Sequence, residues 1–152
     1  MTAKVFVDTN VLVYSRDASE PHKQAQAMAW MSHLWHTKTG KLSYQVLQEF
    51  YITVTAKLQP GLDPENARKD VRALLAWRPI VVNDRVLENA WLIQDRCQLS
   101  WWDSLVVSAA QLADCRYLLT EDLQADQEFG SLRVTNPFHV DPASLVDCST
   151  VF

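Results

Sequence analysis

Short apolar runs alternate with longer stretches of helical composition along the chain, and this alternation limits the fold more than any other feature. The first run, Lys4–Val7, ends in three consecutive apolar residues, as in a strand that is buried on both faces. Such strands belong to parallel sheets covered by helices. We therefore predict an α/β sandwich around a mostly parallel sheet of about four to five strands, with helices on both faces. The other predicted strands are 41–43, 80–82, 117–119 and 132–134.

The stretches between these runs carry signals for helix starts. Pro21 suits the first turn of a helix, Ser43 can cap another, and Asp63 followed by Pro64 opens a third. The last helix is apolar on nearly every side and should therefore be central and buried. From Pro137 onward we expect a loosely structured segment. The predicted helices cover 11–14, 20–36, 44–58, 63–77, 85–97 and 103–113.

The composition is that of one globular domain with a mild acidic excess. The 152 residues are 48% hydrophobic, and six tryptophans indicate a substantial core. With 18 acidic and 14 basic side chains the net charge is −4, which argues against a protein that binds nucleic acid by charge alone. The first apolar run is too short for a signal peptide, and nothing approaches the ~20 apolar residues of a membrane span. We expect a cytoplasmic protein.

The three cysteines do not suggest a disulfide or a zinc site. Cys97, Cys115 and Cys148 are odd in number, widely spaced and without a C-x-x-C pair. We predict that they are small buried hydrophobic side chains.

Acidic residues follow the predicted strands at the edge where ligands bind in open parallel sheets. Asp8 comes directly after the first strand, Asp122 follows the strand at 117–119, and Asp103 begins the buried helix. Carboxylates that converge repel one another and raise one another's pKa, so such a cluster implies a bound cation. With no His or Cys at ligand spacing the ligands are all oxygen atoms, which favours Mg²⁺ or Mn²⁺ over zinc.

Each of these acids also has an ordinary structural interpretation. Asp8 or Asp103 could cap the helix that it precedes, and Asp122 and Asp126 could be solvated acids of a polar loop. Glu49 lies off the centre of the apolar stripe of its helix, so periodicity alone predicts a solvated side chain.

Five segments, in order, resemble the PIN-domain family, particularly the VapC-type ribonuclease toxins of bacterial toxin–antitoxin pairs. Any one segment is weak evidence, but together they extend over nearly the whole chain in the right order. The resemblance implies a PIN-like three-layer sandwich over residues 1–138 and a C-terminal extension over 139–152. The similar segments are 5–14, 42–51, 100–110, 118–123 and 134–138.

The resemblance also assigns roles to individual residues. It implies that Asp8, Glu49, Asp103 and Asp122 form an acidic quartet that holds Mg²⁺ or Mn²⁺, and it overrules the interpretation of Glu49 from periodicity. Asp126 is a candidate accessory ligand of the metal. Asn10 and Thr120 match polar positions that support such ligands through hydrogen bonds, or else they serve only as cap and turn residues.

The activity implied is metal-dependent hydrolysis of RNA, with an antitoxin that places a segment, including an arginine, against the carboxylates. Arg16, Lys38 and Lys41 are the basic residues nearest in sequence to the predicted site, and we take them as candidate contacts to RNA. Trp101 and Trp102 could stack on a base, but core packing is favoured. Family members generally form homodimers. Four apolar side chains could form that contact or lie in the core: Trp30, Met31, Leu34 and Trp35.

Two other functions compete with the ribonuclease. One is a catalytically inactive PIN-like module that binds RNA or protein, against which the four intact acids argue. The other is a metal-dependent phosphatase, which is disfavoured because the first strand ends in Asp-Thr-Asn without the second aspartate of such motifs. Serine hydrolysis finds no support, since Ser104 and Ser108 are not in a nucleophile elbow.

Overall fold

The computed structural model describes residues 3–145, and its centre is a sheet of five short strands. The order across the sheet is β2-β1-β3-β5-β4, and all neighbours are parallel except β4, which pairs with β5 in antiparallel fashion. The prediction of a mostly parallel sheet is confirmed. The strands are β1 Val5–Val7, β2 Gly40–Lys41, β3 Tyr117–Leu119, β4 Glu128–Phe129 and β5 Leu132–Thr135.

The helices begin close to the predicted start signals. Pro21 and Pro64 lie in the first turn of their helices, and the Ser43 hydroxyl accepts the N–H of Val46 as a cap. Asp63 is the N-cap residue of α4 but makes no side-chain bond to the helix backbone. The helices are α1 Thr9–Tyr14, α2 Pro21–Thr37, α3 Tyr44–Ile52, α4 Pro64–Leu74, α5 Asp84–Cys97 and α6 Trp101–Leu112. A π-helical turn, η1 Thr53–Lys57, extends α3, and a 3₁₀ turn, η2 Leu75–Trp77, extends α4.

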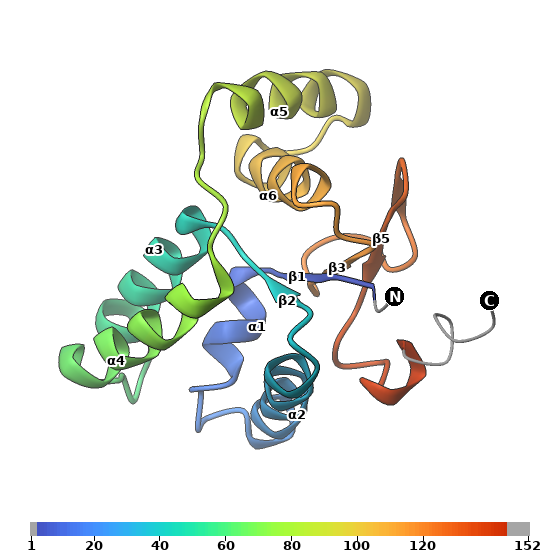
Figure 1. Ribbon diagram of the computed structural model, residues 1–152. Coiled ribbons are helices and arrows are strands. Elements are labelled where there is room, and N and C mark those ends of the chain that lie inside the picture. The colour runs from blue at the N-terminus through green and yellow to red at the C-terminus, as the bar shows by residue number, and fades with distance from the viewer. Residues whose placement is uncertain (1–2, 146–152) are drawn as a thin grey trace.

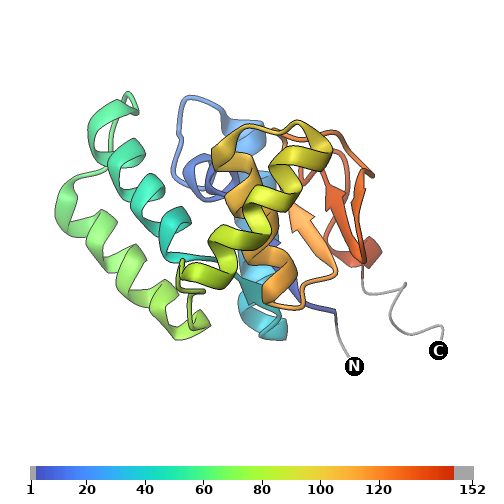
Figure 2. The ribbon, with the colours of Figure 1, turned by 90° about the horizontal axis from the view of Figure 1, so that it is seen from above.

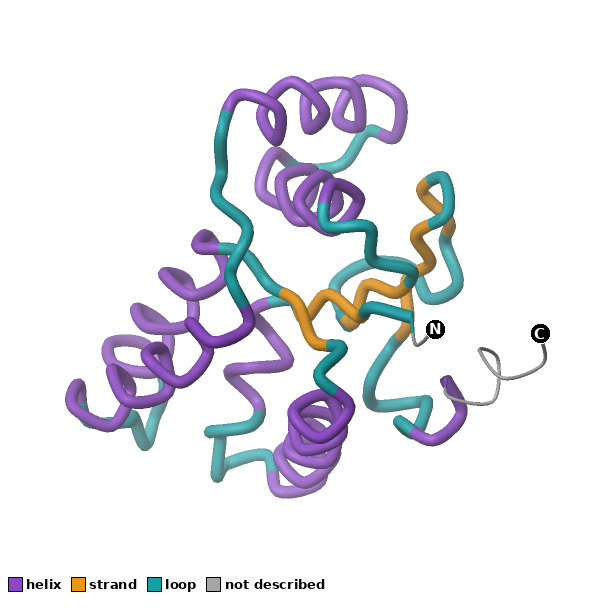
Figure 3. The backbone as a smooth tube through the Cα atoms, in the orientation of Figure 1, coloured by secondary structure: helices purple, strands orange, loops and turns teal. Residues whose placement is uncertain are grey.

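The sheet lies between two layers of helices, as predicted (Figure 1). Helices α5 and α6 cover one face, α1 and α2 cover the other, and α3 with α4 stands beside the β2 edge. Figure 2 shows α5 lying across α6, and Figure 3 shows the central strands between the helices, with the β4–β5 hairpin at the open edge of the sheet. Within residues 3–145, no helix combines the length and apolar character that a membrane crossing needs.

The predicted strand at 80–82 is wrong. Ile80 forms a single parallel bridge with Ser43, and Val81 is 60% exposed. The physical reason is that β2, the neighbour on this edge, is only two residues long, because Ser43 already caps α3. Conversely, β4 was not predicted, since its two residues form only the short outer arm of a hairpin that turns at Gly130, where φ is +62°.

Only some of the tryptophans and cysteines are buried as predicted. Trp30 and Trp77 lie in the core, whereas Trp35, Trp91 and Trp102 are exposed. Cys115 is buried, but Cys97 is exposed because it is the last residue of α5, on the surface of the molecule. Cys148 lies outside the described residues.

The segment after Pro137 is attached to α2, so the prediction of a loose segment is wrong up to residue 145. The indole N–H of Trp30 donates to the carbonyl oxygens of Pro137 and Val140, both at 3.0 Å. The Gln26 amide donates to the Asp141 carboxylate at 3.1 Å. The division at residue 138 stays a prediction. Trp30 and Leu34 could lie in the core or form a contact between subunits. Both are fully buried, so they belong to the core and are not available for such a contact.

Candidate functional site

Asp8 occupies the junction between β1 and α1 and is almost completely buried, with 6% of its surface exposed. Its Oδ1 accepts the backbone N–H of Thr9 at 2.7 Å, and its Oδ2 accepts the hydroxyl of Thr120 at 2.8 Å. The Asp8 N–H donates to Leu119 O at 3.0 Å, which fixes the residue beside the end of β3. The structure therefore makes Asp8 both the N-cap of α1 and a buried acid at the carboxyl edge of the sheet.

Asn10 connects Asp8 to Asp122. Its amide Nδ2 lies 2.9 Å from Thr120 Oγ1, 3.0 Å from Asp122 Oδ2 and 3.3 Å from Asp8 Oδ2. Thr120 Oγ1 also accepts the N–H of Asp122 at 3.1 Å. Thr120 is thus a turn residue and a donor to Asp8 at once. These contacts match the supporting part that the family resemblance implies for Asn10 and Thr120.

Glu49 faces the same edge from α3. The Thr9 hydroxyl donates to its Oε2 and the Gln45 amide donates to its Oε1, each at 2.9 Å. The solvated side chain predicted from periodicity is wrong, because α1 packs on α3 and brings Thr9 to the glutamate. Sequence reasoning gave Gln45 no part in the site. The signal that could have found it is the spacing of Gln45 and Glu49, which places the two side chains on one helix face.

Asp103 is the third residue of α6 and is half-buried. Its backbone N–H donates to the hydroxyl of Ser100 at 3.1 Å, so Ser100 is the N-cap and the alternative of Asp103 as the cap is wrong. The carboxylate of Asp103 also interacts with Ser100, and it lies in the first turn, where the helix dipole favours negative charge.

The carboxylates act on one another electrostatically. Burial raises the pKa of Asp8 from 3.8 to about 7; the hydrogen bonds from Thr120 and Thr9 lower it, and the charges of Asp122 and Asp103 raise it. The pKa of Asp103 is raised as well, first by burial and then by the charges of Asp122 and Glu49, against a lowering bond from Ser100. Four acids from different parts of the chain thus share one region of negative potential.

This donor set suits a hard divalent cation. All the groups are oxygen donors, and a bound cation would offset the burial and the neighbouring negative charges that raise the pKa values of Asp8 and Asp103. Within residues 3–145, no three His, Cys, Asp or Glu side chains are grouped closely enough to hold one ion together. Mg²⁺ commonly keeps several waters and uses only one or two protein carboxylates, so the site fits Mg²⁺ or Mn²⁺ with water completing the coordination.

Asp126 lies apart from the contacts just described. Its N–H donates to Val134 O at 2.9 Å, which places it beside β5, and its charge contributes to the raised pKa of Arg133. Its suggested part as an accessory ligand stays a prediction.

The candidate RNA contacts do not gather at the acids. Arg16 forms a two-pronged ion pair with Asp70, at 2.6 and 2.7 Å. Lys38 ends α2, and the Lys41 ammonium donates to Trp77 O at 3.3 Å. Lys41 is the last residue of β2, where it pairs with Phe6, and Lys38 lies two residues before that strand. Contact of Arg16, Lys38 and Lys41 with RNA stays a prediction.

A basic residue that sequence reasoning missed lies closer to the site. The Lys23 ammonium donates to Glu121 at 2.9 Å, and it lies 4.7 Å from the centre of the Tyr14 ring. Glu121 directly precedes Asp122, and its N–H donates to Asn10 Oδ1 at 3.4 Å. Nothing in the local sequence around Lys23 indicates a partner 98 residues away.

The tryptophans at the start of α6 differ from each other. Trp101 stacks on Trp91 with ring centres 6.1 Å apart, whereas Trp102 is 61% exposed. Core packing is therefore wrong for Trp102, because the first turn of α6 turns this side chain away from the sheet.

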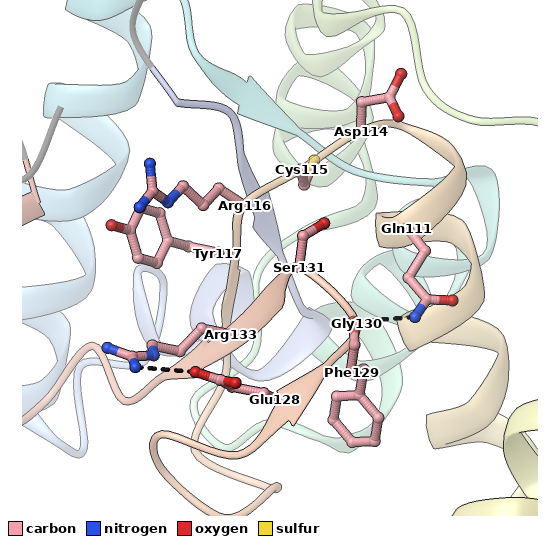
Figure 4. Close-up of a pocket in the computed structure, with 10 residues that line it drawn as sticks. All are labelled: Gln111, Asp114, Cys115, Arg116, Tyr117, Glu128, Phe129, Gly130, Ser131 and Arg133. Carbon is pink, nitrogen blue, oxygen red and sulfur yellow. Dashed lines mark hydrogen bonds and ion pairs between the residues drawn. The ribbon is translucent and has the colours of Figure 1, made fainter. Parts of the chain in front are cut away.

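A separate pocket of about 840 Å³ lies between the end of α6 and the β4–β5 hairpin (Figure 4). Arg116 and Arg133 line it, and Arg133 is paired with Glu128 at 3.0 Å. It adjoins the start of β3, at the opposite edge of the sheet from Asp8, and contains none of the predicted site residues.

Comparisons with known proteins agree with this architecture. The family model for the PIN domain matches residues 5–127. Among solved structures, a toxin–antitoxin complex from Klebsiella pneumoniae has a similar fold, with a TM-score of 0.57 and 15% sequence identity over 88% of this chain and 98% of that one. A search of curated proteins finds no match. Because the family model extends over most of the chain and includes Asp8, Glu49, Asp103 and Asp122, this protein belongs to the PIN-domain family.

Proposed function

We propose that this protein is a divalent-metal-dependent endoribonuclease and the toxin of a toxin–antitoxin pair. The observation that carries the proposal is a buried Asp8, joined to Asp122 through the Asn10 amide, whose pKa is raised to about 7 by burial and by the charges of Asp122 and Asp103. PIN domains are generally nucleases and typically depend on divalent metals. The similar structure from Klebsiella pneumoniae is a toxin–antitoxin complex, which supports the biological role.

The chain's own residues prepare the site. Of the quartet Asp8, Glu49, Asp103 and Asp122, one or two carboxylates together with water would hold Mg²⁺ or Mn²⁺, and the bound ion would polarise the scissile phosphate and lower the pKa of the attacking water. Asn10 keeps Asp8 and Asp122 at a fixed separation through its amide. Such bonds orient the acids before substrate arrives, so less reorganisation is needed during the reaction.

The second pair of bonds serves Glu49. The Thr9 hydroxyl and the Gln45 amide each occupy one oxygen of the carboxylate, which holds it in one rotamer facing the site. Glu49 is therefore oriented toward the site before a cation or substrate binds.

The proposed partners follow from the same negative region. An antitoxin segment that places an arginine against Asp8 and Asp122 would block RNA and neutralise the acids together. A homodimer and action in the cytoplasm complete the proposal.

The test is cleavage of a fluorescent structured RNA by the purified protein with Mg²⁺, Mn²⁺ or a chelator. We expect cleavage with either metal, none with the chelator, and none for folded Asp8→Asn or Asp103→Asn. Asp95→Asn is the matched control, because Asp95 is exposed on α5, and it should cut like the wild type. Undiminished cleavage by both site variants would refute the proposal. No turnover, together with no divalent binding in millimolar calorimetric titrations, would favour the inactive RNA- or protein-binding module.

A further inference from the structure

We propose that the groove between α3 and α6 binds one base of single-stranded RNA next to the scissile phosphate, with Trp102 as its stacking surface. This inference rests on the proposed function and adds to it a position at which the substrate is recognised. The groove has a volume of about 470 Å³, and its walls include Gln45, Glu49, Ile52 and Trp102. That volume is enough for a base but small for a folded partner.

The groove adjoins the acidic site directly. Glu49 belongs to both, and Trp102 immediately precedes Asp103. A nucleotide whose phosphate lies at the acids would therefore have a neighbouring base within reach of the groove. This continuity distinguishes Trp102 from other exposed tryptophans, such as Trp35 near the end of α2.

The surface of the groove is suited to a flat, partly apolar ring. Trp102 is 61% exposed and Ile52 is 51% exposed, although both are large apolar side chains. Leu105 adds a buried apolar contact from α6. Aromatic side chains of this kind are the surfaces on which proteins stack unpaired bases.

Gln45 supplies an independent polar observation. A carboxylate is only an acceptor, so the Gln45 amide nitrogen must face Glu49, and its carbonyl oxygen must point the other way. That oxygen is buried, and in the described part of the chain it accepts no hydrogen bond. Buried acceptors are rarely left unpaired, and because this oxygen has almost no accessible surface, the Gln45 side chain would turn toward the groove to accept an N–H group from a ligand. A base provides a flat ring and an N–H donor together, whereas an aliphatic side chain from a protein partner would leave the oxygen unpaired.

The test is binding of fluorescein-labelled RNA hexamers in Mg²⁺, measured by anisotropy, to full-length Asp103→Asn, in which cutting should be blocked. Adding Trp102→Ala should weaken binding roughly 5- to 150-fold, the range that corresponds to one stacked base. Adding Trp102→Phe should retain most of the affinity, because the ring remains. Trp35→Ala is the matched control and should bind like the parent.

Hexamers with a single abasic position identify the base. At one position the abasic change should weaken binding by the parent but not by the Trp102→Ala variant, since the contact is already lost there. The inference is overturned if Trp102→Ala leaves binding unchanged or if the parent binds no hexamer. It is also overturned if, at every position, the abasic change weakens binding by the Trp102→Ala variant as much as it weakens binding by the parent. Cleavage by the wild type is scored separately. If Trp102→Ala weakens binding but the wild type cuts no RNA, the nuclease proposal is refuted and the base site is kept. If the wild type cuts RNA but Trp102→Ala binds like the parent, the base site is refuted and the nuclease proposal is kept.

Discussion

Replacing Asp8 with asparagine should stabilise the metal-free protein at neutral pH, although it removes a proposed catalytic acid. The shift of the Asp8 pKa from 3.8 to about 7 corresponds to roughly 4 kcal/mol of destabilisation of the folded protein above pH 7. Asparagine has no charge, so this cost disappears. The gain is an upper limit, because the amide cannot reproduce every hydrogen bond of the carboxylate.

The loss can be worked out bond by bond. The amide oxygen can still accept the Thr9 N–H, which lies at 2.7 Å in the wild type. The amide nitrogen would replace Oδ2, where it meets the Asn10 amide, another donor, and the hydroxyl of Thr120. Each lost bond costs about 1 kcal/mol. We therefore expect a net stabilisation of about 1–3 kcal/mol at pH 8.

The direction of the expected change in stability with pH follows from the raised pKa of Asp8. Because the pKa of Asp8 is higher in the folded protein than in the unfolded chain, the folded wild type binds more protons than the unfolded wild type between about pH 4 and pH 7. The contribution of Asp8 to stability is therefore fully present below pH 4 and is lost as the pH rises through 7. Relative to the wild type, Asp8→Asn should gain stability over this interval and then level off.

The assay is urea denaturation in a chelator at several pH values between 4 and 8, followed by tryptophan fluorescence. Asp95→Asn serves as the control and should stay within about 0.5 kcal/mol of the wild type throughout. A difference between Asp8→Asn and the wild type that does not change with pH would show that Asp8 has an ordinary pKa, and the electrostatic account of the site would fail.

Three further predictions concern the same framework. Mg²⁺ or Mn²⁺ should raise the urea midpoint of the wild type at pH 8 but not that of Asp8→Asn, as linkage requires of an ion that binds only the folded site; equal shifts in both would count against a site at Asp8. Asn10→Ala should remain folded by circular dichroism and lose at least tenfold in kcat, because Asp8 and Asp122 lose their shared donor, and unchanged kcat would contradict this. Gly40→Ala should lower the free energy of unfolding by about 1–3 kcal/mol, since its methyl group would overlap the Trp77 ring, and a neutral result would mean that the ring moves easily.

The features predictable from the sequence were those encoded locally. The apolar run at Val5–Val7, the cap at Ser43 and the helix start at Pro64 depend on neighbouring residues alone, and the structure has each of them. The segment at 80–82 has the same apolar composition as a strand, but whether it joins a sheet depends on the length of β2.

Some features of the candidate site are also encoded locally, whereas others depend on how the elements pack. Asp8 could be found because it follows a strand directly, whereas the inward direction of Glu49 depends on Thr9 from α1, and only the family resemblance indicated it. The pairing of Arg16 with Asp70 and the exposure of Trp102 follow from how the helices pack. Periodicity within one helix carries no information about either.

The hydrogen bonds of the Asn10 amide can form only late in the synthesis of this segment of the chain. Its partners Thr120 and Asp122 are 110 and 112 residues further along the chain. During translation, at roughly 5–20 residues per second, Asp8 emerges seconds before the residues that complete its surroundings. A growing chain therefore lacks the assembled acids until β3 has been made and has paired with β1. Activity of the kind proposed would begin only after Thr120 and Asp122 have been made and β3 has paired with β1.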